Sequence, residues 1–236
     1  KKFYLVDRQG LLTDDMTDLV DFQRPYARSK EEVKSWQLEL GEQGLNLEAV
    51  VNHIKPSVLI GCSTVFGAFN ENIVRTMAGA HQHPIIMPLS NPNSHCEADP
   101  SDLMNWTDGR AMIACGSPYP PVEYEGKTYR IAQGNNAFVY PGLGLGVIAA
   151  KANRVTDAML NVACLALSEC SPIRKDKTAP LLPDFSQVQE VSNHVARAVI
   201  KQAIKEGVAG VSDNSDIEFL LRSNTWQAKY YPYKQV

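Results

Sequence analysis

Small polar side chains follow three apolar segments of this sequence, at the points where these segments end. An amide side chain offers a donor and an acceptor without charge, so an asparagine can bridge a substrate hydroxyl and a carboxylate. If the segments are parallel strands, these side chains line one crevice at the carboxyl edge of a sheet, where open α/β sheets bind ligands. The alternative is that Asn-Pro and Ser-Pro are ordinary loop sequences. The three sets are Ser90-Asn91-Pro92, Gly116-Ser117-Pro118 and, after a predicted hairpin, Gly134-Asn135-Asn136.

Asp7 ends another apolar segment, residues 3–6, and could bind a nucleotide. A carboxylate at the end of a parallel strand accepts hydrogen bonds from the hydroxyls of an adenosine ribose and repels a 2'-phosphate. The alternative is a turn aspartate before Gly10. A glycine fingerprint should precede such an acid by about 20 residues. Because the chain starts within a strand and without an initiator Met, we expect it to be a piece of a longer protein.

Two glycine clusters have different interpretations. Gly142-Leu-Gly144-Leu-Gly146 lacks the spacing of a dinucleotide fingerprint and follows a proline at a predicted helix start, so it predicts close helix packing. Residues 61–67 follow a predicted buried strand and precede a helix, so their backbone amides can face a cofactor. The Gly-Lys-Ser/Thr ending of a P-loop is missing there.

The sequence gives little support to other catalytic chemistry. His81 and His83 form an isolated pair in a polar loop, which is more often solvent-exposed than metal-binding, so we assign no metal ligand. Ser117 lacks the GxSxG turn of serine hydrolases, and His194 falls inside a predicted amphipathic helix. We therefore assign no catalytic residue to this chain.

The composition indicates a globular protein with a small-molecule ligand. The chain has 236 residues, 44% of them hydrophobic and 21% charged, with a net charge of -3. This balance provides no polybasic face for nucleic acid or an anionic membrane. No apolar run approaches the roughly 18 residues of a membrane span. The five cysteines lack CxxC spacing and fit reduced thiols, so we expect a cytoplasmic protein.

Short apolar runs alternate with amphipathic stretches over the first half, as in a parallel sheet covered by helices. Predicted strands cover residues 3–6, 58–61, 84–89 and 111–114, a hairpin covers residues 122–131, and helices cover residues 45–54, 70–79 and 100–106, with Asn46, Asn70 and Asp99 as caps. Residues 14–39 are charged and partly helical. Later helices are predicted at residues 141–153, 155–168 and 186–205.

Several long segments resemble the C-terminal portion of malic enzymes, most closely the bacterial NAD-dependent type. The resemblance covers essentially the whole chain, and such ordered matches are more specific than any glycine pattern. The segments are residues 3–12 (FYLVDRQGLL), 54–67 (IKPSVLIGCSTVFG), 87–92 (MPLSNP), 106–118 (WTDGRAMIACGSP), 131–142 (IAQGNNAFVYPG) and 226–230 (WQAKY).

The resemblance implies oxidative decarboxylation of L-malate to pyruvate and CO2, with reduction of NAD and a required Mg or Mn ion. It assigns Asn91, Asn135 and Asn136 to malate and the ribose acid to Asp7. NADP-dependent members tend to carry a lysine where this chain has Gln23, so the resemblance favours NAD. The full cofactor-binding set that it implies is Asp7, Arg8, Gly61, Cys62, Ser63, Ser90 and Asn91.

The family's acid tyrosine, base lysine, acidic metal ligands and glycine fingerprint precede the matched segments. The resemblance therefore implies that this fragment alone is inactive and that the metal ligands lie upstream. Alternatives from other classes are a sensor module that binds a dinucleotide or dicarboxylate without turnover and, less well supported, an amino acid dehydrogenase.

For the architecture, we expect a doubly wound, Rossmann-like, mostly parallel sheet that lacks its first βα unit, followed by an α-helical segment. Residues 1–135 are the predicted NAD-binding domain, and residues 136–236 complete the catalytic domain. The missing strand should expose a sheet edge and apolar surface. We therefore expect a homo-oligomer, a dimer or tetramer in the native enzyme.

Overall fold

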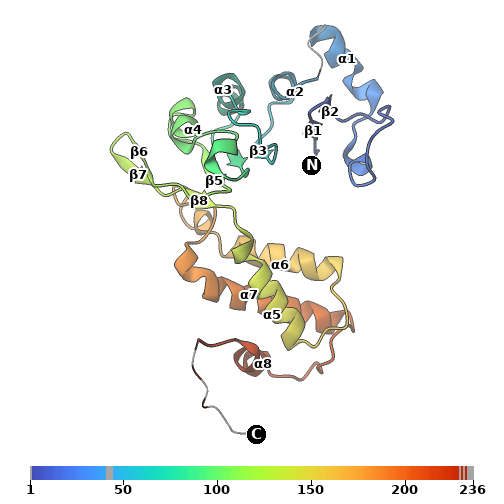
Figure 1. The fold of residues 1–236 in the computed structure, drawn as a ribbon, viewed down its shortest axis with the longest axis vertical. Coiled ribbons are helices and arrows are strands. Elements are labelled where there is room, and N and C mark those ends of the chain that lie inside the picture. The colour runs from blue at the N-terminus through green and yellow to red at the C-terminus, as the bar shows by residue number, and fades with distance from the viewer. Residues whose placement is uncertain (1, 41–44, 229, 231, 233–236) are drawn as a thin grey trace. The chain divides into compact units, whose positions relative to one another are not determined.

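The structure is a computed structural model that describes residues 2–40, 45–228, 230 and 232. The chain divides into two compact units, Lys1–Gly134 and Asn135–Val236. The first unit combines strands and helices, and the second contains helices (Figure 1).

A four-stranded parallel sheet forms the centre of the first unit, with the strand order β3-β4-β5-β8. This sheet confirms the predicted α/β class, and β3, β4 and β5 fall within one residue of the predicted segments. The strands are β3 (Val58–Gly61), β4 (Ile85–Pro88), β5 (Met112–Cys115) and β8 (Ala132–Gln133).

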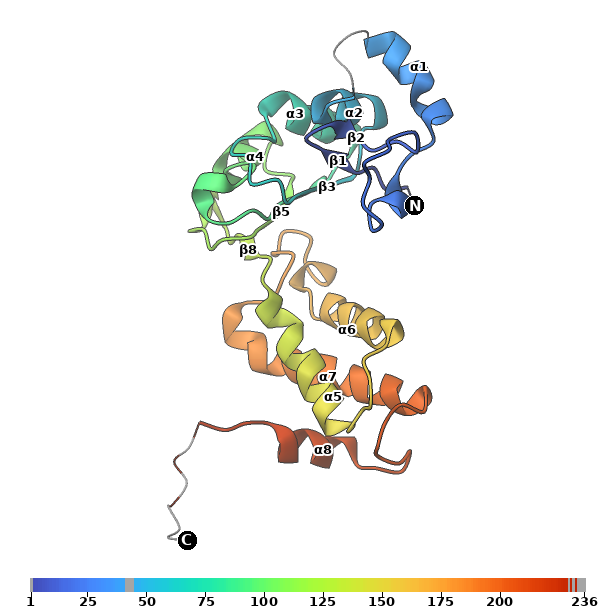
Figure 2. The ribbon, with the colours of Figure 1, turned by 45° about the vertical axis from the view of Figure 1, so that its right-hand side comes forward.

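Three helices alternate with these strands and lie in a row along the sheet (Figures 1 and 2). They are α2 (Leu47–Ile54), α3 (Glu71–Ala80) and α4 (Pro100–Trp106). Asn46, Asn70 and Asp99 cap them with side-chain oxygens, as predicted. The core between sheet and helices contains Ile86 and Met77, both fully buried.

The N-terminal segment differs from the prediction. In place of a strand of the parallel sheet at residues 3–6, β1 (Val6–Asp7) pairs antiparallel with β2 (Gly10–Leu11). Gly10 has a φ of +95°, which lets the chain reverse directly after Asp7. A 3-10 turn (Arg24–Tyr26) and helix α1 (Lys30–Leu40) follow.

The predicted hairpin is present as β6 (Val122–Tyr124) and β7 (Lys127–Tyr129). Its turn residues Glu125 and Gly126 both have positive φ, as a two-residue hairpin turn requires. The prediction that the hairpin's second strand itself leads into Gly134 is wrong, because a separate strand, β8, follows it and pairs with β5.

The second unit contains the three predicted helices and a fourth, α8, that the sequence analysis did not predict. Gly142 and Gly146 of α5 face Val195 and Val199 of α7 so closely that a Cβ at either glycine would lie 2.6–2.7 Å from a valine Cβ. This confirms close helix packing there, whereas a Cβ at Gly144 would meet open space. The helices are α5 (Tyr140–Ala149), α6 (Asp157–Glu169), α7 (Val188–Lys205) and α8 (Ile217–Asn224).

Short 3-10 turns complete the second unit at Asn136–Phe138, Pro172–Arg174 and Phe185–Gln187, and another lies in the first unit at Asn93–His95. Over the part of the chain that the structure describes, no helix has both the length and the apolar character that a membrane span needs.

Candidate functional site

The ends of β4, β5 and β8 meet at one edge of the sheet, because the three strands are parallel neighbours. The Ser117 hydroxyl, after β5, donates a hydrogen bond to Asn91 Oδ1, after β4. Gly116 lies so close to β4 that a Cβ on it would fall 2.0 Å from the Leu89 carbonyl oxygen. The predicted convergence of the polar groups after β4 and β5 is therefore confirmed.

Strand β8 brings its own end to the same edge. The amide of Gly134 donates to the Cys115 carbonyl over 2.7 Å, and the Gln133 side chain donates to the Gly116 carbonyl over 3.1 Å. These bonds fix the chain immediately before Asn135.

Asn135 and Asn136 begin the second unit, and both are exposed. The Asn135 side chain accepts a hydrogen bond from the Ala137 amide over 2.9 Å and caps the short turn that leads into α5. The Asn91 side chain is also exposed in the first unit. All three amides are therefore accessible to a small ligand.

Ser63 and Ser90 are brought together by a residue that the sequence analysis missed, Glu97. One carboxylate oxygen of Glu97, Oε1, accepts the Ser63 amide over 2.7 Å, the Ser63 hydroxyl over 2.9 Å and the Ser90 hydroxyl over 2.6 Å. The other oxygen, Oε2, accepts the Ser90 amide over 3.3 Å. The two hydroxyls therefore point toward the protein interior.

Glu97 has no exposed surface, yet its pKa lies below the ordinary value of 4.5. Burial by itself raises this pKa, but the hydrogen bonds from Ser90 and Ser63 outweigh burial and favour the charged form. The same carboxylate and burial raise the pKa of the Cys62 thiol. The sequence offers only a weak indication that Glu97 is buried, namely its position between the apolar residues Cys96 and Ala98.

The loop after β3 remains exposed beyond Ser63. Thr64 has a φ of 58°, and its amide donates to the Ser90 hydroxyl over 2.9 Å. Cys62, Thr64 and Val65 are exposed, so this loop presents surface at the carboxyl end of β3.

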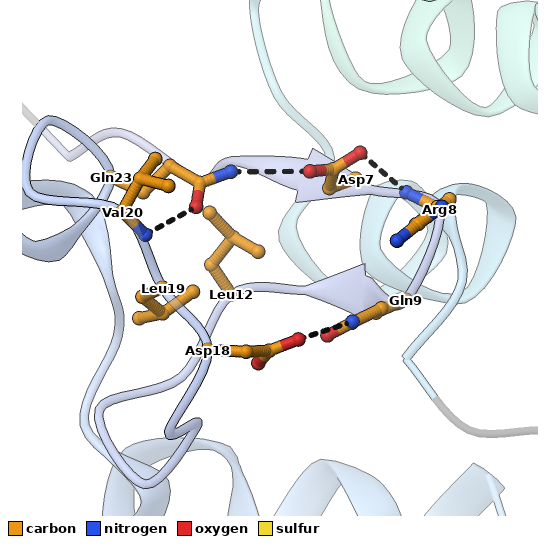
Figure 3. Close-up of a pocket in the computed structure, with 8 residues that line it drawn as sticks. All are labelled: Asp7, Arg8, Gln9, Leu12, Asp18, Leu19, Val20 and Gln23. Carbon is orange, nitrogen blue, oxygen red and sulfur yellow. Dashed lines mark hydrogen bonds between the residues drawn. The ribbon is translucent and has the colours of Figure 1, made fainter.

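Asp7 lines a shallow pocket near the N-terminus (Figure 3). Its carboxylate is exposed and accepts hydrogen bonds from the Arg8 amide over 2.7 Å and from the Gln23 side chain over 3.1 Å. Across the pocket, the Gln9 side chain donates to Asp18 over 2.7 Å. The pocket is lined by Asp7, Arg8, Gln9, Leu12, Asp18, Leu19, Val20 and Gln23.

This pocket fits the ribose end of a dinucleotide chemically. A carboxylate that accepts from neutral donors retains acceptor capacity for ribose hydroxyls. For a metal ion, the described residues contain no group of three or more His, Cys, Asp or Glu side chains that could hold one.

His81, weighed above as a metal ligand, and His194, weighed above as a member of a serine triad, make contacts of other kinds. The His81 ring is hydrogen-bonded to the Lys55 carbonyl at 2.7 Å. His194 lies in α7, as predicted, and is paired with Glu169 at 2.9 Å.

Comparison with known proteins points to one family. Residues 1–204 match the family model described as "Malic enzyme, NAD binding domain". The NAD-dependent malic enzyme of Proteus mirabilis is 47% identical over 234 residues, covering 99% of this chain and 41% of that protein. NAD-dependent malic enzyme 3 of Bacillus subtilis is 47% identical over 236 residues, covering all of this chain and 41% of that protein.

Solved structures agree in fold. The Entamoeba histolytica malic enzyme superposes with a TM-score of 0.68 at 23% identity and covers 94% of this chain and 40% of its own. The Pyrococcus horikoshii malic enzyme gives a TM-score of 0.62 at 21% identity, covering 91% of this chain and 43% of its own. The chain thus spans about two fifths of the length of the curated relatives it matches.

Proposed function

The chain belongs to the malic enzyme family, and we propose that it serves as the NAD-binding part of an enzyme that oxidatively decarboxylates L-malate to pyruvate and CO2. The observation that carries the proposal is the match of residues 1–204 to the family's NAD-binding domain. The names of the relatives, which all specify NAD, support NAD as the cofactor. No observation favours the alternative of a sensor module.

In this proposal, Asp7 receives the adenosine ribose, with Arg8 beside it. The exposed carboxylate of Asp7 and the hydrogen bond from Gln23 support this role. A neutral glutamine at that position adds no positive charge to attract a 2'-phosphate, which favours NAD over NADP.

The loops after β3 and β4 contact the rest of the cofactor. Gly61, Cys62, Ser63 and Ser90 belong to these loops. Because both the hydroxyl and the amide of each serine donate to Glu97, the two serines would shape the surface beside the cofactor rather than donate to it. Asn91 lies at the adjoining strand end, and its exposed side-chain amide supports a role in binding malate. The resemblance gives the same role to Asn135 and Asn136.

The proposal gives this chain cofactor and substrate binding but neither proton transfer nor metal binding. The family's tyrosine, lysine and metal ligands have no counterpart assigned among these 236 residues. A bound Mg or Mn ion would polarise the carbonyl of the keto-acid intermediate in the whole enzyme. We therefore expect no malate-dependent NADH formation by the purified chain with Mn, measured by absorbance; turnover under these conditions would contradict this expectation.

We further propose a dimer or tetramer in a reducing cytoplasm. All five cysteines are free thiols in the structure, which supports a reducing compartment.

The first test is a titration of NADH and NADPH into this chain, followed by nicotinamide fluorescence. We expect NADH to bind, NADPH to bind more weakly, and Asp7→Ala to weaken NADH binding by about tenfold, the loss of a charge-assisted hydrogen bond. Asp21→Ala, an exposed aspartate outside the pocket lining, is the matched control and should bind as the wild type does. Tighter binding of NADPH than NADH would contradict the assignment of NAD.

A further inference from the structure

The Glu97 carboxylate is charged although it has no exposed surface, and its hydrogen bonds are divided unequally between its two oxygens. Three donors converge on Oε1 and one on Oε2. The donors that lower its pKa are the hydroxyls of Ser90 and Ser63 and the backbone amides of Ser63 and Glu97 rather than a cationic side chain. A buried charge is costly unless such bonds compensate for it, so this arrangement requires a defined loop geometry.

These donors come from two loops, the one after β3 and the one after β4. A single hydrogen bond of the sheet ladder connects the two loops where they begin. The ladder between β3 and β4 continues for one bond past the strands, from the Leu89 amide to the Gly61 carbonyl over 2.9 Å. Farther along, the two loops are connected in the described structure through Glu97 and through the Ser90 hydroxyl, which accepts from Thr64.

The segment around Glu97 also holds the far end of the loop after β3. The Gly67 amide donates to the Cys96 carbonyl over 3.3 Å, and the Phe69 amide donates to the Glu97 carbonyl over 3.0 Å. Both ends of residues 62–69 are thus attached to the same segment, one end through the carboxylate and the other through backbone bonds.

Gly61 provides the space that the Glu97 side chain occupies. A Cβ on Gly61 would lie 2.6 Å from Glu97 Cδ and 2.7 Å from Phe69 Cζ. The resemblance assigns Gly61 to the cofactor, whereas in the structure its missing side chain admits Glu97.

We propose that Glu97 is a positioning residue that holds the loops after β3 and β4 in the geometry that binds the dinucleotide. The role rests on the proposed function, because it is through these loops that the chain would contact NAD. Glu97 itself is buried beneath them and touches no ligand.

The charge and the shape of Glu97 can be tested separately. In Glu97→Gln the amide oxygen can retain the three donors at Oε1, but the NH2 group then faces the Ser90 amide, donor against donor. Glu97→Asp keeps the charge with a shorter side chain. Glu71→Gln is the matched control, since Glu71 is an exposed glutamate on α3 whose partner is Arg75.

The experiment combines NADH titration with hydrogen–deuterium exchange of the same 236-residue proteins. For Glu97→Gln we expect NADH binding to weaken by about tenfold, as for one lost hydrogen bond to a charged group. Exchange should accelerate in residues 62–69 and 89–91 and stay unchanged in α7 of the second unit. Glu97→Asp should fall between wild type and Glu97→Gln, and Glu71→Gln should match the wild type.

Unchanged NADH binding by Glu97→Gln overturns the proposal, and so does faster loop exchange without weaker binding, which would indicate a merely structural role. If Glu97→Gln fails to fold, Ser63→Ala removes one donor from Oε1, and unchanged binding and exchange in that variant overturn the proposal. If the wild type does not bind NADH, the chain does not form the NAD site without the upstream glycine fingerprint, and the proposal that these residues bind NAD by themselves fails. If the wild type binds NADH but Glu97→Gln lacks the expected effect, only the role of Glu97 fails.

Discussion

Individual side chains at the strand ends have uses that their types alone do not reveal. The resemblance assigns Ser63 and Ser90 to the cofactor, but both hydroxyls donate to Glu97. Glu97 lies 34 residues from Ser63 and 7 from Ser90, so no local pattern links them. A single glutamate in a loop is ordinarily interpreted as exposed, and its burial depends on tertiary packing. The Asn91–Ser117 contact, by contrast, follows from strand order and was predictable.

The lowered pKa of Glu97 has a consequence for acid stability. Because folding lowers this pKa, the folded state binds fewer protons, and the group stabilises the fold above its ordinary pKa of 4.5. The stabilisation is lost as the pH falls from there through the lowered pKa.

We therefore expect the difference in unfolding free energy between wild type and Glu97→Gln to be largest above pH 4.5 and to shrink on acidification. Urea unfolding of both proteins at pH 7, 5, 4 and 3 measures this difference. Other carboxylates titrate in both proteins and cancel. A difference that stays constant from pH 7 to 3 would show that Glu97 is not charged in the folded chain.

At the scale of elements, local signals predicted the helices better than the short strands. Asn46, Asn70 and Asp99 cap helices where the sequence places them, because a cap is set by a few neighbouring residues. Strands β1, β2 and β8 have two residues each, too few for an apolar pattern of their own, and Ala132 of β8 pairs with Ala114 of β5 across the intervening hairpin. The hairpin between β1 and β2 depends on the positive φ of Gly10, a conformation that the sequence permits without specifying.

The packing of α5 on α7 gives a prediction with an internal control. Gly146→Ala places a Cβ 2.7 Å from Val199 Cβ and 2.9 Å from the Ala196 carbonyl oxygen, atoms that a rotamer change cannot move. We expect it to destabilise the chain by about 1–3 kcal/mol, as overpacking does. Gly144→Ala meets open space and should stabilise α5 by about 0.5–1 kcal/mol.

Thermal unfolding followed by circular dichroism compares these variants. For a chain of this size, about 2–4 °C of change in Tm corresponds to each kcal/mol. The two alanines should therefore move Tm in opposite directions. An equal effect at both positions would mean that helix propensity, rather than contact with α7, determines the role of these glycines.

At the scale of the molecule, the sheet of the first unit has two unlike faces. Leu59, Ile86 and Ile113 belong to the core that also contains residues of α2, α3 and α4. On the other face of β3, Val58 and Ile60 are 43% and 57% exposed. Parallel sheets in stable proteins are covered on both faces, so these side chains form an apolar surface that favours association.

We expect the purified chain to sediment as an oligomer or aggregate rather than as a monomer. Replacing Ile60 with lysine puts a charge on the apolar surface and should shift the distribution toward monomer in sedimentation velocity. Leu165→Lys is the matched control, because Leu165 is 54% exposed on α6 in the second unit.

The two substitutions separate the possible surfaces of association. If Ile60→Lys yields monomer and Leu165→Lys does not, the exposed face of β3 is where copies meet, and the uncovered face of this terminal strand of the sheet is the physical cause. If Leu165→Lys alone yields monomer, copies associate through the helical unit, and the apolar face of β3 stays exposed to water without causing association. A wild-type chain that is a monodisperse monomer would contradict the expectation, because the exposed β3 side chains would then be too few to drive association.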